Sequence, residues 1–284
     1  MYFDIYILKR PGAREEWADF RFPEGYGQGR DVLAEADAMA KVMTPEKDHK
    51  LVENIVIKTQ GFVSGNFSEN DEAPVQKFRE FLALYKDIDK AKLRENMKYF
   101  LESIMPVCEE CDINMCVHPD DPPIEVLGLP RIVRTEEDIR WFLEAVPNKH
   151  NGLTFCAGSL SAGAYNNVVE LAKEFAPRTH FVHLRSCHIF PNGDFTEASH
   201  LGGRADLVEL CRIFEKENPA LPMRVDHGMT FTDKPGGVFD ESNHGHNAGY
   251  TLLGRMFAMG QVQGILATVD RELGIEYKQP GFFD

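Results

Sequence analysis

Several features that define other protein classes are missing from this sequence. Its 284 residues include only six cysteines, which are too few for a disulfide scaffold in a chain of this length. No stretch approaches the ~18 consecutive apolar residues of a membrane-spanning helix. The start of the chain, Met1–Asp4, lacks the basic and apolar regions of a signal peptide. These absences predict a cytoplasmic protein with no membrane partner.

Basic residues are scarce relative to acidic ones. The chain has 31 Lys and Arg against 45 Asp and Glu, which gives a formal net charge of −14. This balance argues against a nucleic-acid partner, although a few local Arg residues are enough to bind a small anionic substrate. Apolar residues make up 43% of the chain and charged residues 27%, the proportions of a globular protein.

The character of the sequence changes near residue 90. Before that point the apolar runs are few and irregular, and Phe3–Leu8 and Val52–Ile57 fit strands or buried helical turns equally well. After it, strand and helix patterns alternate. We therefore predict one domain, in which residues 1–90 form an irregular or helical lead-in and residues 91–284 carry the regular part of the fold.

The second part of the chain has short apolar runs separated by helical periodicity. The predicted strands are Ile113–Val117, Leu153–Phe155, His180–Val182, Met223–Val225 and Val262–Val269. The predicted helices lie around Leu93–Ile104, Thr135–Val146, Asn167–Phe175, Ala205–Phe214 and Gly249–Met259. This alternation predicts an α/β fold with a parallel sheet, for which an open doubly wound sheet and a closed (β/α)8 barrel are the two candidate architectures.

One metal-capable residue follows each of the first four predicted strands: His118, Cys156, His183 and Asp226. Their spacings of 38, 27 and 43 residues fit barrel units of ~31 residues with loop insertions. Only a barrel brings four successive strand ends to a common space, so the pattern favours the (β/α)8 fold. A mixed set of imidazoles, thiolate and carboxylate suits Mn²⁺, Fe²⁺ or Zn²⁺ better than Ca²⁺ or Mg²⁺.

Charged residues next to these ligands are candidate substrate contacts. Arg185 lies two residues after His183, and Arg224 lies two residues before Asp226. An Arg fork binds a carboxylate with two hydrogen bonds, so both predict an acidic substrate, and ion pairs with local acids are the alternative. Asp120 is a third candidate contact, although it and the neighbouring Asp121 could instead orient a ligand imidazole or cap the next turn.

Several longer segments resemble the mannonate dehydratase family. They are Leu84–Asn96, Val117–Pro123, Leu127–Val133, Phe155–Ser159, His183–Ser186, His200–Gly203, Arg224–Gly228 and Gly249–Tyr250. The resemblance implies a (β/α)8 barrel of the metal-dependent sugar isomerase-like type, which dehydrates D-mannonate to 2-keto-3-deoxy-D-gluconate in hexuronate breakdown. It also implies Mn²⁺ or Fe²⁺ as the cofactor and His118, Cys156, His183 and Asp226 as its ligands.

The resemblance also suggests acid–base residues. The family's proposed catalytic tyrosine corresponds to Tyr250, and His200 or His227 is a candidate for the complementary role. Dehydration requires a base for the proton beside the carboxylate and an acid for the departing hydroxyl. A sugar or sugar-acid isomerase begins with the same proton abstraction, so the ligand set alone leaves that activity as an alternative.

The sequence departs from the family at its start. Family members carry an N-terminal segment with the first barrel strands, whereas this chain predicts only about five of the eight strands that close the barrel. We therefore expect an incomplete barrel whose unpaired strand edges are covered by self-association into a homo-oligomer. An inactive truncated remnant is the corresponding alternative function.

Overall fold

The computed structural model describes residues 32–47, 80–125, 129–191, 193–231 and 249–276. The chain divides into two compact units. The first comprises residues 1–93 and 125–130 and contains the helix α2 (Val32–Val42). The second comprises residues 94–124 and 131–284 and contains every strand among the described residues. The predicted elements Phe3–Leu8 and Val52–Ile57 lie outside the described residues.

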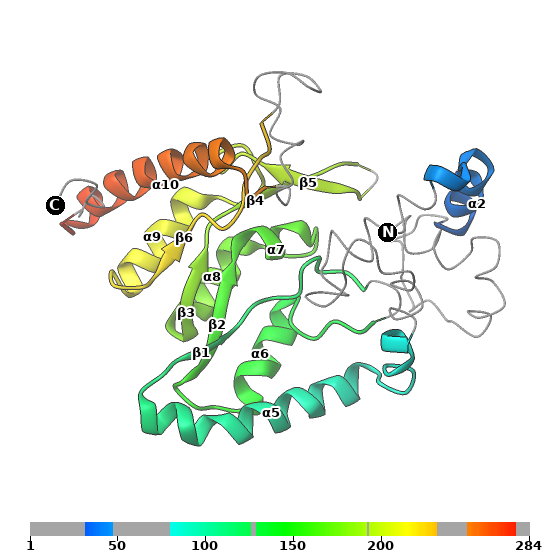
Figure 1. Cartoon of the computed structure of the whole chain (residues 1–284). Helices are drawn as coiled ribbons and strands as arrows, with labels where there is room; N and C mark the ends of the chain where they lie inside the picture. The colour runs from blue at the N-terminus through cyan, green and yellow to red at the C-terminus, as the bar shows by residue number, and fades with distance from the viewer. Residues whose placement is uncertain (1–31, 48–79, 126–128, 192, 232–248, 277–284) are drawn as a thin grey trace. The chain divides into compact units, whose positions relative to one another are not determined.

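The second unit is built on a four-stranded parallel sheet with the strand order β1-β2-β3-β6 (Figure 1). The strands are β1 (Met115–Val117), β2 (Asn151–Cys156), β3 (Thr179–His183) and β6 (Met223–Arg224). Every residue of β2 is buried, as expected for the centre of a parallel sheet. The first four predicted strands are thus confirmed, and the protein has an α/β fold.

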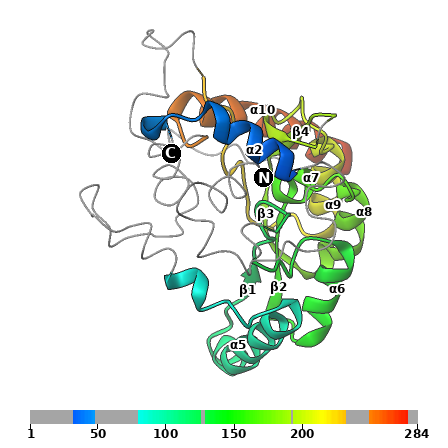
Figure 2. The same cartoon turned by 90° about the vertical axis from the view of Figure 1, so that its right-hand side faces the viewer.

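Helices pack on the sheet and connect its strands. The helices of this unit are α5 (Lys90–Cys111, which begins in the first unit), α6 (Glu136–Ala145), α7 (Ala157–Ala162), α8 (Val168–Phe175), α9 (Leu207–Glu217) and α10 (Leu252–Leu273). Figure 2 shows α6, α8 and α9 on one side of the strands. Phe155 of β2 contacts Phe214 of α9 edge to face, with ring centroids 5.0 Å apart. These buried aromatic rings join the sheet to its helical layer.

Side-chain caps set where three of the helices begin. Thr135 accepts a hydrogen bond from the Asp138 amide at the start of α6. Asn167 and Asp206 do the same for α8 and α9. Each cap satisfies a backbone N–H that has no partner within its helix. The predicted helices at these positions are confirmed to within a few residues.

Two features differ from the sequence prediction. The predicted strand Val262–Val269 lies within the helix α10, where Val262, Ile265 and Val269 are buried on one face. Their spacing of three and four residues suits a helix, and a short apolar run does not distinguish the two structures by itself. An antiparallel hairpin of β4 (Ser186–Ile189) and β5 (Phe195–Ala198) follows β3, where no strands were predicted.

None of the helices in the described part of the chain is long and apolar enough to span a membrane.

Candidate metal centre

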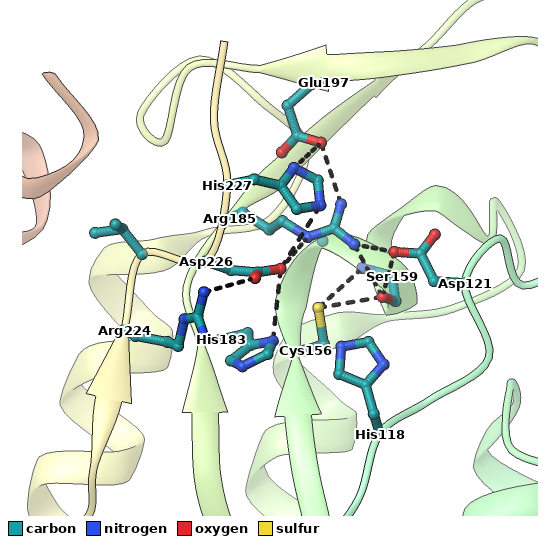
Figure 3. A network of polar contacts seen from close by, with 12 residues as sticks. His118, Asp121, Cys156, Ser159, His183, Arg185, Glu197, Arg224, Asp226 and His227 are labelled. Carbon is teal, nitrogen blue, oxygen red and sulfur yellow. Dashed lines mark hydrogen bonds and ion pairs between the residues drawn. The ribbon is translucent and has the colours of Figure 1, made fainter. Parts of the chain in front are cut away.

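The carboxyl ends of the parallel strands bring four side chains together (Figure 3). His118 follows β1, Cys156 ends β2, His183 ends β3 and Asp226 lies just beyond β6. One possible ligand atom from each residue lies within 4.8 Å of the other three. The parallel ladder contributes to this, because Cys156 is paired directly with His183 beyond a register shift at Leu153 and Thr154. The four residues that the spacing singled out therefore form one cluster.

The surroundings of Cys156 favour the ionised form of its thiol. Its complete burial would raise its pKa, but the Arg185 guanidinium and hydrogen bonds from His118 and His183 outweigh this and lower the pKa to about 5. The hydroxyl and the backbone amide of Ser159 also lie 3.1 and 3.5 Å from the sulfur. Cys156 is consequently a thiolate at neutral pH, which is the form that binds metals.

The two histidines and the aspartate complete a donor set that fits a divalent cation. His183 Nδ1 is buried without a hydrogen-bond partner among the described residues and lies 3.5 Å from Asp226 Oδ2. Burial would raise the pKa of Asp226, but His183, His227 and Arg185 lower it overall, so the carboxylate is charged. A buried imidazole nitrogen without a hydrogen-bond partner among the described residues, beside a thiolate and a carboxylate, suits a borderline metal such as Mn²⁺, Fe²⁺ or Zn²⁺.

The backbone at Asp226 is held in an uncommon conformation. Its φ angle is +54°, in the left-handed region that residues other than glycine rarely adopt. Asp tolerates this region better than most residues, yet such a conformation costs about 1–3 kcal/mol and persists where the surroundings enforce it. The turn at the end of β6 thus directs the carboxylate toward His118, Cys156 and His183.

Arg185 connects the four-residue cluster to its surroundings. Its side chain is only 3% exposed, and Nε lies 3.1 Å from Asp226 Oδ2. Nη1 lies 3.1 Å from Glu197 Oε2, while Nη2 contacts both Asp121 and the Ser159 hydroxyl. The predicted substrate fork is therefore occupied by three carboxylates of the protein, which matches the ion-pair alternative.

The other predicted substrate contacts differ in their surroundings. Asp120 Oδ2 accepts hydrogen bonds from the backbone amides of Ile132 and Val133 at 2.8 and 2.7 Å, so its carboxylate holds a loop together. Asp121, its neighbour, is the acid that reaches the ligand cluster through Arg185. The side chain of Arg224 is 40% exposed and its Nη2 lies 3.4 Å from Asp226 Oδ1, which leaves it accessible to a ligand.

The three predicted acid–base residues do not all lie beside the cluster. His227 and Tyr250 lie side by side, with ring centroids 5.3 Å apart, and His227 Nε2 is 3.6 Å from Asp226 Oδ2. His200 is 1% exposed, its Nε2 lies 3.2 Å from the Val225 carbonyl oxygen, and burial lowers its pKa. His227 and Tyr250 therefore adjoin the four-residue cluster, whereas His200 contacts the backbone just beyond β6.

Burial also sets the protonation of the groups beside the cluster. Burial and the Arg185 guanidinium lower the pKa of His227 to about 4, so its imidazole is neutral. Burial and the Asp226 carboxylate raise the pKa of Tyr250, so its phenol stays protonated.

Glu197 is a residue of the site that sequence reasoning missed. This residue lies on β5 of the unpredicted hairpin, and its Oε2 is 3.3 Å from His227 Nδ1. Burial raises the pKa of Glu197 to about 7, although the Arg185 guanidinium opposes this. No motif or spacing marks the residue, because it reaches Arg185 and His227 only through the pairing of β5 with β4.

Comparison with known proteins identifies the family. The sequence profile of D-mannonate dehydratase (UxuA) matches residues 23–276. The chain belongs to the D-mannonate dehydratase family. A mannonate dehydratase from Marinomonas sp. (strain MWYL1) is 36% identical over 96% of the chain, and one from Chromohalobacter salexigens is 34% identical over 96%. The chain spans only 65% and 66% of the lengths of these two relatives.

A solved structure shows the same relationship. The crystal structure of mannonate dehydratase from Streptococcus suis serotype 2 superposes with a TM-score of 0.66 at 25% sequence identity. The match covers 76% of this chain and 61% of that structure. The resemblance found in the sequence motifs is therefore confirmed at the level of family and of α/β fold.

Proposed function

We propose that this chain carries the metal-dependent dehydration of D-mannonate to 2-keto-3-deoxy-D-gluconate, a step of hexuronate catabolism. The observation that carries the proposal is the convergence of His118, Cys156, His183 and Asp226 in a member of the D-mannonate dehydratase family. The cation is Mn²⁺ or Fe²⁺, with Zn²⁺ as a third candidate for the same donor set. Family membership also supports a cytoplasmic location.

We also propose that the four parallel strands belong to a (β/α)8 barrel. The order β1-β2-β3-β6 follows the chain, and each strand delivers its last polar side chain to the same end of the sheet. Active sites of such barrels lie at that end. Homo-oligomerisation stays a prediction, which sedimentation of the purified chain would test.

The chemistry requires charge stabilisation, a base and an acid. A bound divalent cation would supply Lewis-acid stabilisation of the negative charge that develops on the substrate carboxylate. His227 is the proposed base, because its neutral imidazole can accept the proton beside that carboxylate. Tyr250 is the proposed acid, since its phenol keeps the proton that the departing hydroxyl needs.

The arginines take different parts in this proposal. Arg224 is the substrate contact, because its exposed guanidinium is free to turn toward a sugar-acid carboxylate. Arg185 is a positioning residue, since its guanidinium is buried against Asp121, Glu197 and Asp226. His200 likewise acts through the backbone that it supports.

The test is product analysis of the Mn²⁺-loaded chain incubated with D-mannonate. Mass spectrometry should show the loss of one water, and NMR should show a 2-keto-3-deoxy acid. Tyr250→Phe should lower kcat by ~10²–10⁴-fold, the usual contribution of general acid–base catalysis. A product of unchanged mass would instead indicate an isomerase, and no conversion by the fully metal-loaded chain would contradict the proposed activity.

A further inference from the structure

The β4–β5 hairpin brings a carboxylate to the metal cluster from outside the parallel sheet. Glu197 is paired with Cys187 in the antiparallel ladder, and its side chain is 20% exposed. Its Oε2 faces two cationic or polar partners, Arg185 Nη1 at 3.1 Å and His227 Nδ1 at 3.3 Å (Figure 3). The other oxygen, Oε1, is buried and has no hydrogen-bond partner among the described residues.

The imidazole of His227 lies between two carboxylates. Nδ1 is closer to Glu197, whereas Nε2 is 3.6 Å from Asp226 Oδ2. That Asp226 oxygen already receives Arg185 Nε at 3.1 Å and belongs to the ligand cluster. A neutral imidazole carries one N–H, on either Nδ1 or Nε2. A hydrogen-bond acceptor beside one of these nitrogens stabilises the tautomer that has its proton there.

We propose that Glu197 is the positioning residue of His227: it accepts the Nδ1 proton and so leaves the Nε2 lone pair facing the metal cluster. The inference rests on the proposed function for its catalytic meaning, because a base must present an unprotonated nitrogen to the substrate. Arg185 holds the same Glu197 oxygen and thereby fixes the carboxylate in place. A carboxylate that orients an imidazole at a metal site is a general device for fixing its tautomer.

The competing explanation is that Glu197 merely neutralises Arg185. In that case its removal would alter stability but leave the imidazole of His227 unchanged, because Asp121 and Asp226 still contact the guanidinium. The two explanations therefore differ in what happens to His227.

The first experiment measures the tautomer directly. Long-range ¹H–¹⁵N spectra of ¹⁵N-histidine-labelled, Zn²⁺-loaded protein should show His227 protonated at Nδ1 alone, with its signals assigned by their loss in His227→Gln. Glu197→Ala should produce a mixture of both tautomers. Glu197→Gln should keep the wild-type tautomer, because the amide oxygen still accepts the proton. Wild-type protein with the proton on Nε2, or a Glu197→Ala spectrum identical to that of the wild type, would overturn the inference.

The second experiment measures turnover of D-mannonate by the Mn²⁺-loaded chain. Glu197→Ala should lower kcat by ~10–100-fold, the usual cost of losing such an outer contact, with little change in KM or in bound metal. Glu197→Gln should recover most of the loss, and Thr196→Ala, an exposed neighbour on the same strand, should match the wild type. Unaltered kcat in Glu197→Ala would contradict the inference.

The two experiments separate this inference from the proposed function. If the wild type does not dehydrate D-mannonate, but Glu197→Ala changes the tautomer of His227, the positioning role stands and the proposed activity is refuted. If the wild type dehydrates D-mannonate, but Glu197→Ala leaves the His227 tautomer unchanged, the proposed activity stands and the positioning role is refuted.

Discussion

The two ends of the parallel sheet use polar side chains in different ways. At the amino ends, Arg178 Nη2 donates to the carbonyl oxygens of Asn148 and Asn151. His180, at the start of β3, lies 3.0 Å from the Lys149 carbonyl oxygen through its Nε2. These side chains satisfy backbone groups where loops enter the strands, so their contribution is to stability.

At the carboxyl ends, polar side chains contact one another as well as the backbone, which His118 Nδ1 reaches at the Pro119 carbonyl oxygen 2.6 Å away. His183 ends the same strand that carries His180, but its Nδ1 has no hydrogen-bond partner in the described part of the chain. Arg185 contacts three carboxylates there, whereas Arg178 contacts two carbonyl oxygens. Arg and His side chains occur at both ends of the sheet, so residue type alone does not distinguish the clustered side chains from those that bind only backbone groups.

The largest expected effect comes from exchanging the two histidines of β3 for alanine. His183→Ala should release the metal, with affinity reduced beyond the ~10–100-fold typical of an outer contact, because a direct ligand is removed. His180→Ala should keep about one metal per chain, since its imidazole contacts only a backbone carbonyl. Elemental analysis of the purified variants measures both. Equal metal content in the two variants would contradict the claim that His183, and not His180, binds the metal.

A smaller effect is expected when the two arginines are compared. Arg185→Ala removes the guanidinium that Asp121, Glu197 and Asp226 share and leaves Asp226 with Arg224 alone among the arginines, and breaking a buried ion pair in this way costs ~3–5 kcal/mol. Arg178→Ala removes hydrogen bonds to two carbonyl oxygens and should cost ~1–3 kcal/mol. The free energy of unfolding of the metal-free variants in urea tests this difference.

Added Mn²⁺ should sharpen the contrast between these variants. A cation bound beside Asp226 replaces part of the charge that Arg185→Ala removes, so this variant should gain more stability from Mn²⁺ than Arg178→Ala gains. An equal loss of stability in both variants, with equal gains from Mn²⁺, would show that Arg185 is not the electrostatic centre of the site.

The ligand cluster could be anticipated because it depends on strand order and little else. Four short apolar runs, each followed by a metal-capable residue, predict a common position once the strands are parallel and adjacent. The structure places the four ligand atoms within 4.8 Å of one another. The separation of Asp120 from Asp121 could not be anticipated, because the two adjacent carboxylates differ only in the partners that the folded loop presents.

The hairpin and α10 show where local pattern fails. Glu197 lies in the segment Phe195–Ala198, whose alternation is too short to indicate a strand, and its partners are distant in sequence. The apolar run of Val262–Val269 suits a buried strand and a helix face alike, and only packing against α9 decides between them. Tertiary contacts determine both the position of Glu197 and the helical conformation of residues 262–269, and a single sequence does not display such contacts.

The smallest expected effect concerns an acidic pair on the structural side of the sheet. Glu215 is near the end of α9, which leads into the amino end of β6, and its side chain is buried close to Asp270 of α10. Burial and the Asp270 carboxylate raise the pKa of Glu215 from 4.5 to about 7. The folded state therefore binds more protons than the unfolded state between these values, so the free energy of unfolding falls as pH rises through that window.

Glu215→Gln should remove this pH-dependent loss. At pH 8 the variant should be more stable than the wild type by ~1–2 kcal/mol, because the wild type must keep a buried carboxylate ionised there. At pH 5 the two proteins should differ little, since folded wild-type Glu215 is then protonated. Glu217→Gln, an exposed change of the same charge on the same helix, should stay within ~0.5 kcal/mol of the wild type at both values. Urea unfolding at the two pH values measures this, and a stabilisation that is independent of pH would show that the charge of Glu215 is not its cause.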